Sequence, residues 1–305
     1  MNRNLKVFWS LLLFLIAILS SLVMGEGIVR LLAPQQLIVL NERIWKPDSV
    51  LSWRYVAHAD EHVNLGEKTV RFVSDEHGFR INAQEPEPKR CAESILFLGD
   101  SFLEALQVEN ESTFVQLLQR KIINEHKQEL CVVNTGVGGW GPNHYYMQAR
   151  AELGRRNYSL GVVCLYVGND VVSRFDTTLS PRAPVERHVF RMPRSLVFSE
   201  WRDAVLYPVN DFLETRSHLF LFLKMRGQTL LSRAGLTAEY FPPIFNTSYA
   251  QSSAWATTAD VCFRIKLLFD ERSIPTLFVL IPAPYQVHDE VFRDFVRGFG
   301  IDERS

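Results

Sequence analysis

The sequence predicts an α/β fold built on a doubly wound parallel sheet. Three apolar segments, residues 95–98, 131–134 and 160–167, each run into a polar turn that contains glycine, and a helical pattern separates each from the next. An uninterrupted apolar run such as 95–98 is typical of a strand buried on both faces. Because connections between parallel strands are right-handed, we expect helices on both faces of the sheet and all three turns at one edge.

Composition excludes some classes of function. The chain has 305 residues, 47% hydrophobic and 22% charged, which is enough for a sizeable core. A net charge of -1, a pI near 6.7 and the lack of a basic run argue against a nucleic-acid partner. The four cysteines contain no C-x-x-C pair, so we expect no structural zinc site and interpret most of them as buried thiols. They are Cys91, Cys131, Cys164 and Cys262. We also expect no cofactor.

The amino terminus predicts a membrane anchor. Arg3 and Lys6 precede an apolar run over residues 7–24, close to the roughly 20 residues that span a bilayer. The core of a signal peptide has about 7 to 15 residues, so we favour an uncleaved anchor over residues 1–25. Cleavage before Glu26 remains the alternative. The basic flank would keep the amino terminus in the cytoplasm and place the rest of the chain outside, in a periplasmic or extracellular position.

Residues 26–90 form a β-rich connecting segment in this interpretation. Residues 52–56 and 68–73 alternate apolar and polar side chains, which predicts strands of a small antiparallel element. Three histidines lie here among acidic residues but show no ligand spacing, so we expect no metal site. They are His58, His62 and His77. Residues 84–90 are rich in proline and polar residues and predict a linker before a main domain over residues 91–305.

Gly99-Asp100-Ser101 follows the first predicted strand of that domain. Ligands of open α/β sheets bind outside the carboxyl ends of the strands, so the Ser101 hydroxyl is a candidate nucleophile. The same three residues also suit an ordinary turn, because glycine tolerates positive φ while Asp and Ser hydrogen-bond to nearby backbone.

A helix is predicted next, with Ser112 as its N-cap. Its apolar face is expected to contain Phe114, Leu117, Leu118 and Ile122. Residues 135–141 after the second strand are glycine-rich, which fits either a plain turn or a backbone that approaches a ligand closely. The glycine positions do not match G-x-G-x-x-G, so a dinucleotide-binding loop is not favoured.

A helix over residues 143–153 leads to the third strand, which ends in Gly168-Asn169-Asp170. The pattern then breaks into an insertion over residues 171–253, either a lid or a docking surface, with an apolar helix near 218–231 and a turn at 241–243. A second regular helix and a fourth strand, 276–281, follow. The helix is expected to bury Val261, Cys262, Ile265, Leu268 and Phe269.

These turns resemble the first three sequence blocks of the SGNH, or GDSL, hydrolase superfamily. The matching residues are Gly99-Asp100-Ser101, Asn134 with Gly139, and Gly168-Asn169-Asp170. The resemblance covers residues 90–170 closely and 255–287 more loosely. The anchor and residues 76–80 look like the membrane-anchored bacterial members of that superfamily.

The resemblance implies a flavodoxin-like sheet and a serine esterase site. Ser101 would be the nucleophile, and its backbone N–H, the Gly139 N–H and the Asn169 side-chain amide would form the oxyanion hole. Acyl transfer needs such fixed donors, and losing one costs about 100-fold to 1000-fold in rate.

The catalytic base of the family is missing from its usual motif. The family supplies it from a D-x-x-H block, and none of the eight histidines here has an aspartate three residues before it. His288 follows the fourth strand, earlier than the family places its base, and we interpret it as a helix-start residue. A fifth strand and a closing helix are also missing, so we expect the chain to stop short of a full family domain.

Two hypotheses follow. In the first, the protein is a membrane-anchored, extracytoplasmic esterase or acyl-transfer enzyme, whose substrate the resemblance places among acylated small molecules or carbohydrates. In the second, it is a non-catalytic binding or assembly protein that keeps the pocket without the base.

Overall fold

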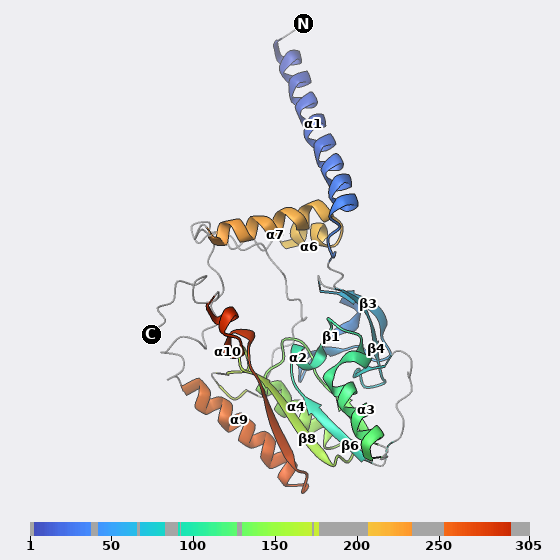
Figure 1. Cartoon of the computed structure of the whole chain (residues 1–305), viewed down its shortest axis with the longest axis vertical. Helices are drawn as coiled ribbons and strands as arrows, with labels where there is room; N and C mark the ends of the chain where they lie inside the picture. The colour runs from blue at the N-terminus through green and yellow to red at the C-terminus, as the bar shows by residue number, and fades with distance from the viewer. Residues whose placement is uncertain are drawn as a thin grey trace. The chain divides into compact units, whose positions relative to one another are not determined.

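A computed structural model describes residues 3–37, 42–65, 68–82, 91, 93–126, 130–172, 174–176, 207–233 and 253–293 (Figure 1). The chain divides into two compact units. One unit combines Met1–Val39 with Arg187–Glu239, and the other combines Leu40–Glu186 with Tyr240–Ser305. The domain boundaries inferred above, after residues 25 and 90, stay predictions.

The second unit contains the parallel sheet that the sequence predicts. Its strands are β6 (Glu93–Leu98), β7 (Leu130–Asn134), β8 (Leu160–Tyr166) and β9 (Thr276–Ile281). They pair in the order β7-β6-β8-β9, and every pair is parallel. With β6 first in the chain, this is the order in which flavodoxin-like sheets begin. The predicted fold class is confirmed.

Helices cover both faces of this sheet. Side chains of a strand alternate between its faces, and on β6 Ile95 and Phe97 share a buried cluster with Val115 of α3 (Phe114–His126). Leu96 and Leu98 belong to a second cluster, formed with α4 (Pro142–Glu152) and α9 (Ser253–Asp270). The first strand is therefore buried on both sides, as its apolar run predicts.

Helix α9 buries the predicted residues, whereas α3 does so only in part. Val261, Ile265 and Phe269 of α9 are fully buried, with Cys262 and Leu268 partly buried against the same cluster. On α3 the prediction holds for Ile122, which is partly buried against the cluster, and is wrong for Phe114, Leu117 and Leu118, which are 43%, 51% and 38% exposed; Val115 is the buried residue.

The start of α3 also differs from the prediction. A 3₁₀ turn, η2 (Asn110–Ser112), occupies the expected N-cap, and the Thr113 hydroxyl accepts a hydrogen bond from the Gln116 N–H at 3.4 Å. Thr113 therefore takes the capping role predicted for Ser112. The helix meets the sheet through Val115 and Ile122, which are seven residues apart and share one face.

The β-rich segment is antiparallel, as predicted. After η1 (Glu42–Ile44), strand β1 (Trp45–Asp48) pairs with β2 (Ser52–Tyr55), and β4 (Thr69–Ser74) lies between β3 (Asp60–Asn64) and β5 (Arg80–Ile81). The predicted strands correspond to β2 and β4. The proposed linker at 84–90 and the turn at 241–243 lie outside the described residues.

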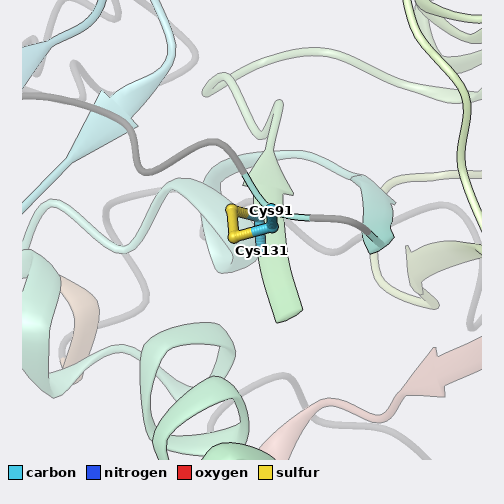
Figure 2. Close-up of a disulfide and its surroundings, with 2 residues drawn as sticks. All are labelled: Cys91 and Cys131. Atoms are coloured by element: carbon cyan, nitrogen blue, oxygen red, sulfur yellow. A yellow bond between two sulfur atoms is a disulfide. The ribbon is translucent and has the colours of Figure 1, made fainter. Parts of the chain in front are cut away.

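A disulfide joins Cys91 and Cys131, whose Cα atoms are 5.5 Å apart (Figure 2). Our interpretation of the cysteines as buried thiols is wrong for this pair and holds for Cys164, which is free and buried; Cys262 is free and partly buried. The sheet register brings the two cysteines near one another, because Ser94 of β6 lies opposite Cys131 of β7 and Cys91 lies two residues before the start of β6. Sequence alone hides this proximity, since 40 residues separate the two cysteines.

The first unit consists of α1 (Arg3–Leu32), α6 (Tyr207–Glu214) and α7 (His218–Arg233). Within α1, Leu5–Leu32 is long and apolar enough to cross a membrane, and the side chains of its most apolar window are not buried in the structure. Helix α7 matches the predicted insertion helix, whereas α6 was not predicted. Figure 1 shows α6 and α7 side by side at the carboxyl end of α1.

Candidate functional site

Ser101 is the first residue of a short helix, α2 (Ser101–Glu104), that begins where β6 ends. The Asp100 carboxylate caps this helix by accepting a hydrogen bond from the Phe102 N–H at 3.0 Å. Ala105, with φ 50°, ends it in the left-handed conformation. Ser101 is partly exposed at the carboxyl edge of the sheet, where a hydroxyl can meet a ligand.

The glycine-rich turn after β7 is hydrogen-bonded to this helix. The Asn134 side chain donates to the Leu103 carbonyl at 2.9 Å and accepts from the Gly136 N–H at 2.9 Å. Gly139 is exposed and has φ 77°, and a Cβ there would lie 3.1 Å from the Trp53 ring. Only glycine therefore fits without strain at this position.

The turn after β8 lies on the other side of β6. Tyr166 stacks on Phe102 of α2, with 4.0 Å between the ring centroids. Asn169 is exposed, and its backbone N–H donates to the Tyr166 carbonyl at 3.2 Å. Because β6 pairs with both β7 and β8, Ser101, Gly139 and Asn169 follow three neighbouring strands at one edge of the sheet. Their catalytic roles stay predictions.

Sequence reasoning missed a buried glutamate that joins three elements. The Glu104 carboxylate accepts hydrogen bonds from the Gly138 N–H, at 3.0 Å, and from the Tyr55 hydroxyl. The Trp53 indole donates to the Gly138 carbonyl at 3.1 Å. Strand β2 therefore holds the glycine-rich turn against α2. No local sequence pattern around Glu104 predicts these contacts, because the partners come from β2 and from the turn after β7, which are distant in the sequence.

Arg80 of β5 supports the end of α2. Its guanidinium donates to the carbonyls of Glu104 (2.9 Å), Ala105 (2.8 Å) and Val108 (2.7 Å). Burial lowers the pKa of Arg80 to about 10, so the side chain still carries its positive charge at neutral pH. The sequence feature that could have identified Arg80 is the segment 76–80, which was noted above only for its resemblance to anchored family members.

Beneath the turns lies the carboxyl group of Asp170. The Tyr145 hydroxyl is 3.0 and 3.1 Å from its two oxygens, and the Tyr166 N–H donates to Oδ2 at 2.8 Å. Burial, and then the nearby charge of Asp100, raise the pKa of Asp170 to about 8. At neutral pH Asp170 is therefore mostly protonated, and its hydrogen bonds hold the turn after β8 in place.

Two histidines follow strands of the parallel sheet in the sequence and are candidates for the catalytic base. His144 stacks on Trp140, and its Nδ1 accepts from the Gly141 N–H at 3.2 Å; burial lowers its pKa to about 4, so it is neutral at pH 7. His288 is exposed and follows β9, between α10 (Pro284–Val287) and a helical turn whose Phe292 N–H donates to the His288 carbonyl at 2.9 Å. The second arrangement is that of a helix-start residue, as predicted.

Within the part of the chain that the structure describes, no group of three or more His, Cys, Asp or Glu side chains is placed to hold a metal ion.

No family model and no curated protein sequence matches the chain. Among solved structures it is similar to AlinE4, an SGNH-hydrolase family esterase, with 13% identity over 62% of this chain and 77% of that chain and a TM-score of 0.25. It is similar to TesA, with 17% identity over 57% and 75% of the two chains and a TM-score of 0.27. A catalytic mutant of Axe2, an acetylxylan esterase from Geobacillus stearothermophilus, has 14% identity over 71% and 98% and a TM-score of 0.25. We therefore argue the function from the site itself.

Proposed function

We propose that the protein is a membrane-anchored, extracytoplasmic serine esterase or acyl-transfer enzyme with Ser101 as its nucleophile. The observation that carries the proposal is the position of Ser101, Gly139 and Asn169 after three neighbouring parallel strands. The Asn134 side chain joins the first two of these turns through hydrogen bonds to Leu103 and Gly136. This arrangement brings a hydroxyl and candidate oxyanion donors to one edge.

The reaction would follow ordinary acyl transfer. The Ser101 oxygen attacks the carbonyl carbon of an ester, and the oxyanion that forms is stabilised by the Ser101 and Gly139 N–H groups and the Asn169 amide. The C–O bond to the alcohol then breaks, the alcohol oxygen takes a proton, and water or another alcohol removes the acyl group from the serine. Acylated carbohydrates are the substrates that the sequence resemblance suggests.

The base that accepts the serine proton is not assigned. Asp170 is mostly protonated at neutral pH, and the Nδ1 of His144 accepts a backbone hydrogen bond. The resemblance assigns this role to the histidine of a D-x-x-H block, which these 305 residues lack. His288 is the alternative within the chain, because it follows β9 and therefore the same edge of the sheet.

Two observations support a position outside the cytoplasm. Helix α1 is long and apolar enough to cross a membrane, and Arg3 and Lys6 lie at its amino end. The Cys91–Cys131 disulfide fits an oxidising compartment, since such bonds are rare in the cytosol.

A non-catalytic binding protein is the second candidate. It would apply if the protein contains no D-x-x-H motif in any segment, because serine is a weak nucleophile without a base; these 305 residues contain none. The two candidates differ in whether Ser101 reacts at all.

Ester hydrolysis by Ser101 variants tests the proposal. The 305-residue protein should hydrolyse p-nitrophenyl acetate feebly, since a site without its full triad retains up to about 1000-fold catalysis over water. In the 305-residue protein Ser101→Ala should lower this rate little further, because the oxyanion hole and binding supply it and the members of the triad act as a unit. In a longer chain that includes a D-x-x-H block, Ser101→Ala should abolish turnover almost as completely as removing the histidine, while Ser112→Ala, on η2, is the matched control and should leave the rate unchanged. A folded Ser101→Ala variant of that longer chain with the full rate would show that Ser101 is a turn residue.

The base is tested by adding or removing histidine. Robust turnover that His288→Ala abolishes would make His288 the base. In a longer chain that includes a D-x-x-H block, turnover should rise, and Asn169→Ala should lower kcat by about 100-fold to 1000-fold. KM should change little, because the Asn169 amide would bind the oxyanion more tightly than the ground-state carbonyl.

A further inference from the structure

The amino-terminal end of α7 is hydrogen-bonded to α1. The Glu26 carboxylate of α1 accepts hydrogen bonds from the backbone N–H groups of His218 (3.1 Å) and Leu219 (2.9 Å) and from the Ser217 hydroxyl (2.8 Å). A carboxylate there satisfies the free N–H groups at the start of α7 and suits the helix dipole. Arg30 adds a bond from its guanidinium to the Arg216 carbonyl at 3.1 Å.

The level of this junction along α1 is set by helix geometry. The candidate span begins at Leu5. At about 1.5 Å per residue, the distance from Leu5 to Glu26 is roughly 32 Å, close to the ~30 Å thickness of the hydrocarbon core. If α1 spans the membrane, α7 starts where α1 leaves the hydrocarbon.

The side of α7 that contacts α1 carries three leucines, with Arg226 among them in the helix register. A Cβ on Gly25 of α1 would lie 3.1 Å from Leu219, so the two helices touch closely there. Leu223 and Leu230 follow Leu219 by four and eleven residues, which places all three on one face of a helix with 3.6 residues per turn. Leu223 is 57% and Leu230 is 66% exposed. We call these three residues the apolar face of α7.

The other side of α7 packs against α6. Leu221 and Lys224 are buried, and the Lys224 ammonium forms an ion pair with Glu214 and donates to the Asn210 side chain at 2.9 Å. Helix α6 occupies this side, and with respect to the described residues Leu223 and Leu230 of the apolar face are exposed.

Aromatic rings and arginines flank the helix pair. The Arg226 guanidinium lies 4.1 Å from the centre of the Phe222 ring, and that of Arg216 lies 4.6 Å from the centre of the Phe212 ring. Arginines beside aromatic rings are typical of helices that lie in a membrane interface, where the charge reaches the headgroups and the ring stays at the acyl boundary.

We propose that the apolar face of α7 lies in the lipid interface beside α1. The inference rests on the membrane anchoring in the proposed function and is independent of the chemistry of Ser101. A lipid surface is the occupant that the contacts favour over a protein partner, because the apolar face continues the apolar surface of α1 from the Gly25 contact outward. The chain would then be held by a spanning helix and by a second helix lying along the membrane surface.

Photolabelling from lipid tests the proposal on the full chain. The protein is reconstituted in vesicles of phosphatidylcholine and phosphatidylglycerol that contain a phospholipid with a diazirine on its acyl chain. After irradiation, mass spectrometry of peptides should find lipid adducts on α1 and on Leu223 and Leu230. Leu117 of α3, which is 51% exposed, is the control leucine and should carry at least tenfold fewer adducts.

Variants sharpen the assignment. Leu223→Gln with Leu230→Gln should lower labelling of α7 at least tenfold and leave labelling of α1 unchanged. Met225→Gln is the matched control, because Met225 is 59% exposed on the same helix but lies off the apolar face. It should leave labelling of α7 unchanged.

The outcomes separate the two proposals. Labelled α1 with unlabelled α7 would overturn the interfacial position and leave the anchor intact. Unlabelled α1 would overturn both. Cross-links that join Leu223 or Leu230 to a second copy of the chain would show that protein, and not lipid, covers the apolar face.

Discussion

Asp170 is a residue whose ionisation should affect stability. The groups that face its carboxyl are Asp100 from the β6–α2 turn, Tyr145 from α4, Cys164 from β8 and Cys262 from α9. Burial raises the pKa of Cys164 to about 12 and that of Cys262 to about 11. Burial also raises the pKa of Tyr145 well above its ordinary value, so these three groups carry no charge near neutral pH. Near neutral pH, Asp100 is therefore the neighbour whose charge opposes ionisation of Asp170.

Stability should consequently fall as pH rises. The pKa of Asp170 is about 8 in the folded protein against 3.8 for the free group, so the folded state binds more protons between these values. The free energy of unfolding then declines from about pH 4 to pH 8. Asp170→Asn removes this contribution while its amide can still bond to Tyr145. Urea unfolding at pH 5, 6.5 and 8 should show wild type losing up to about 1.4 kcal/mol per pH unit relative to the variant.

The control for this experiment is Asp260→Asn, which changes an exposed aspartate on α9. Its stability should follow the wild-type dependence on pH. Parallel profiles for wild type and Asp170→Asn would show that Asp170 is ionised in the folded state.

At the level of single residues, the sequence predicts candidate site residues that directly follow a strand. Ser101 was singled out because it follows a predicted buried strand, and Gly139 and Asn169 were named from the family resemblance; all three follow neighbouring parallel strands, whose carboxyl ends meet at one edge. Tyr55 and Arg80 were not identified. Their roles depend on β2 and β5 packing against α2, and no local sequence pattern encodes contacts between distant strands.

At the level of elements, strands were easier to predict than the orientation of helices. Consecutive apolar residues identify β6 and β8 because a strand buried on both faces needs them. On α3, apolar residues surround much of the helix, so the pattern could not decide that Val115 would meet the sheet and Leu117 would be exposed. Helix α6 is short and lies where the regular pattern breaks up, and its partner Lys224 comes from α7.

The disulfide between the starts of β6 and β7 gives a prediction at the same scale. Closing a loop of 40 residues should lower the entropy of the unfolded chain enough to stabilise the fold by about 4 kcal/mol. The double variant Cys91→Ala with Cys131→Ala should unfold at correspondingly lower urea concentration, and reductant should have the same effect on wild type. Cys262→Ala, which leaves the bond intact, is the control. Equal stability of wild type with and without reductant would contradict the prediction.

At the level of the whole molecule, the proposed anchor would determine where the protein works. Expressed in a bacterium, the chain should stay in the membrane fraction after carbonate washing, with its carboxyl-terminal part accessible to protease from outside. Leu12→Arg with Leu15→Arg should release it, because charges at the centre of a span cost about 3 kcal/mol each. A mature protein that begins near Glu26 would identify residues 1–25 as a cleaved signal peptide.

The position of the insertion in the sequence determines the order in which the sheet can form. Strands β7, β6 and β8 are neighbours both in the sheet and along the chain, whereas roughly a hundred residues, including α6 and α7, separate β8 from β9. Closing so long a loop costs about 4 kcal/mol in chain entropy and slows folding. We therefore expect β7, β6 and β8 to associate before β9 is in place. Strand β9 can join them only after α6 and α7, which precede it in the chain, have been synthesised. The face of β8 that α9 covers is therefore the last part of the sheet to be buried.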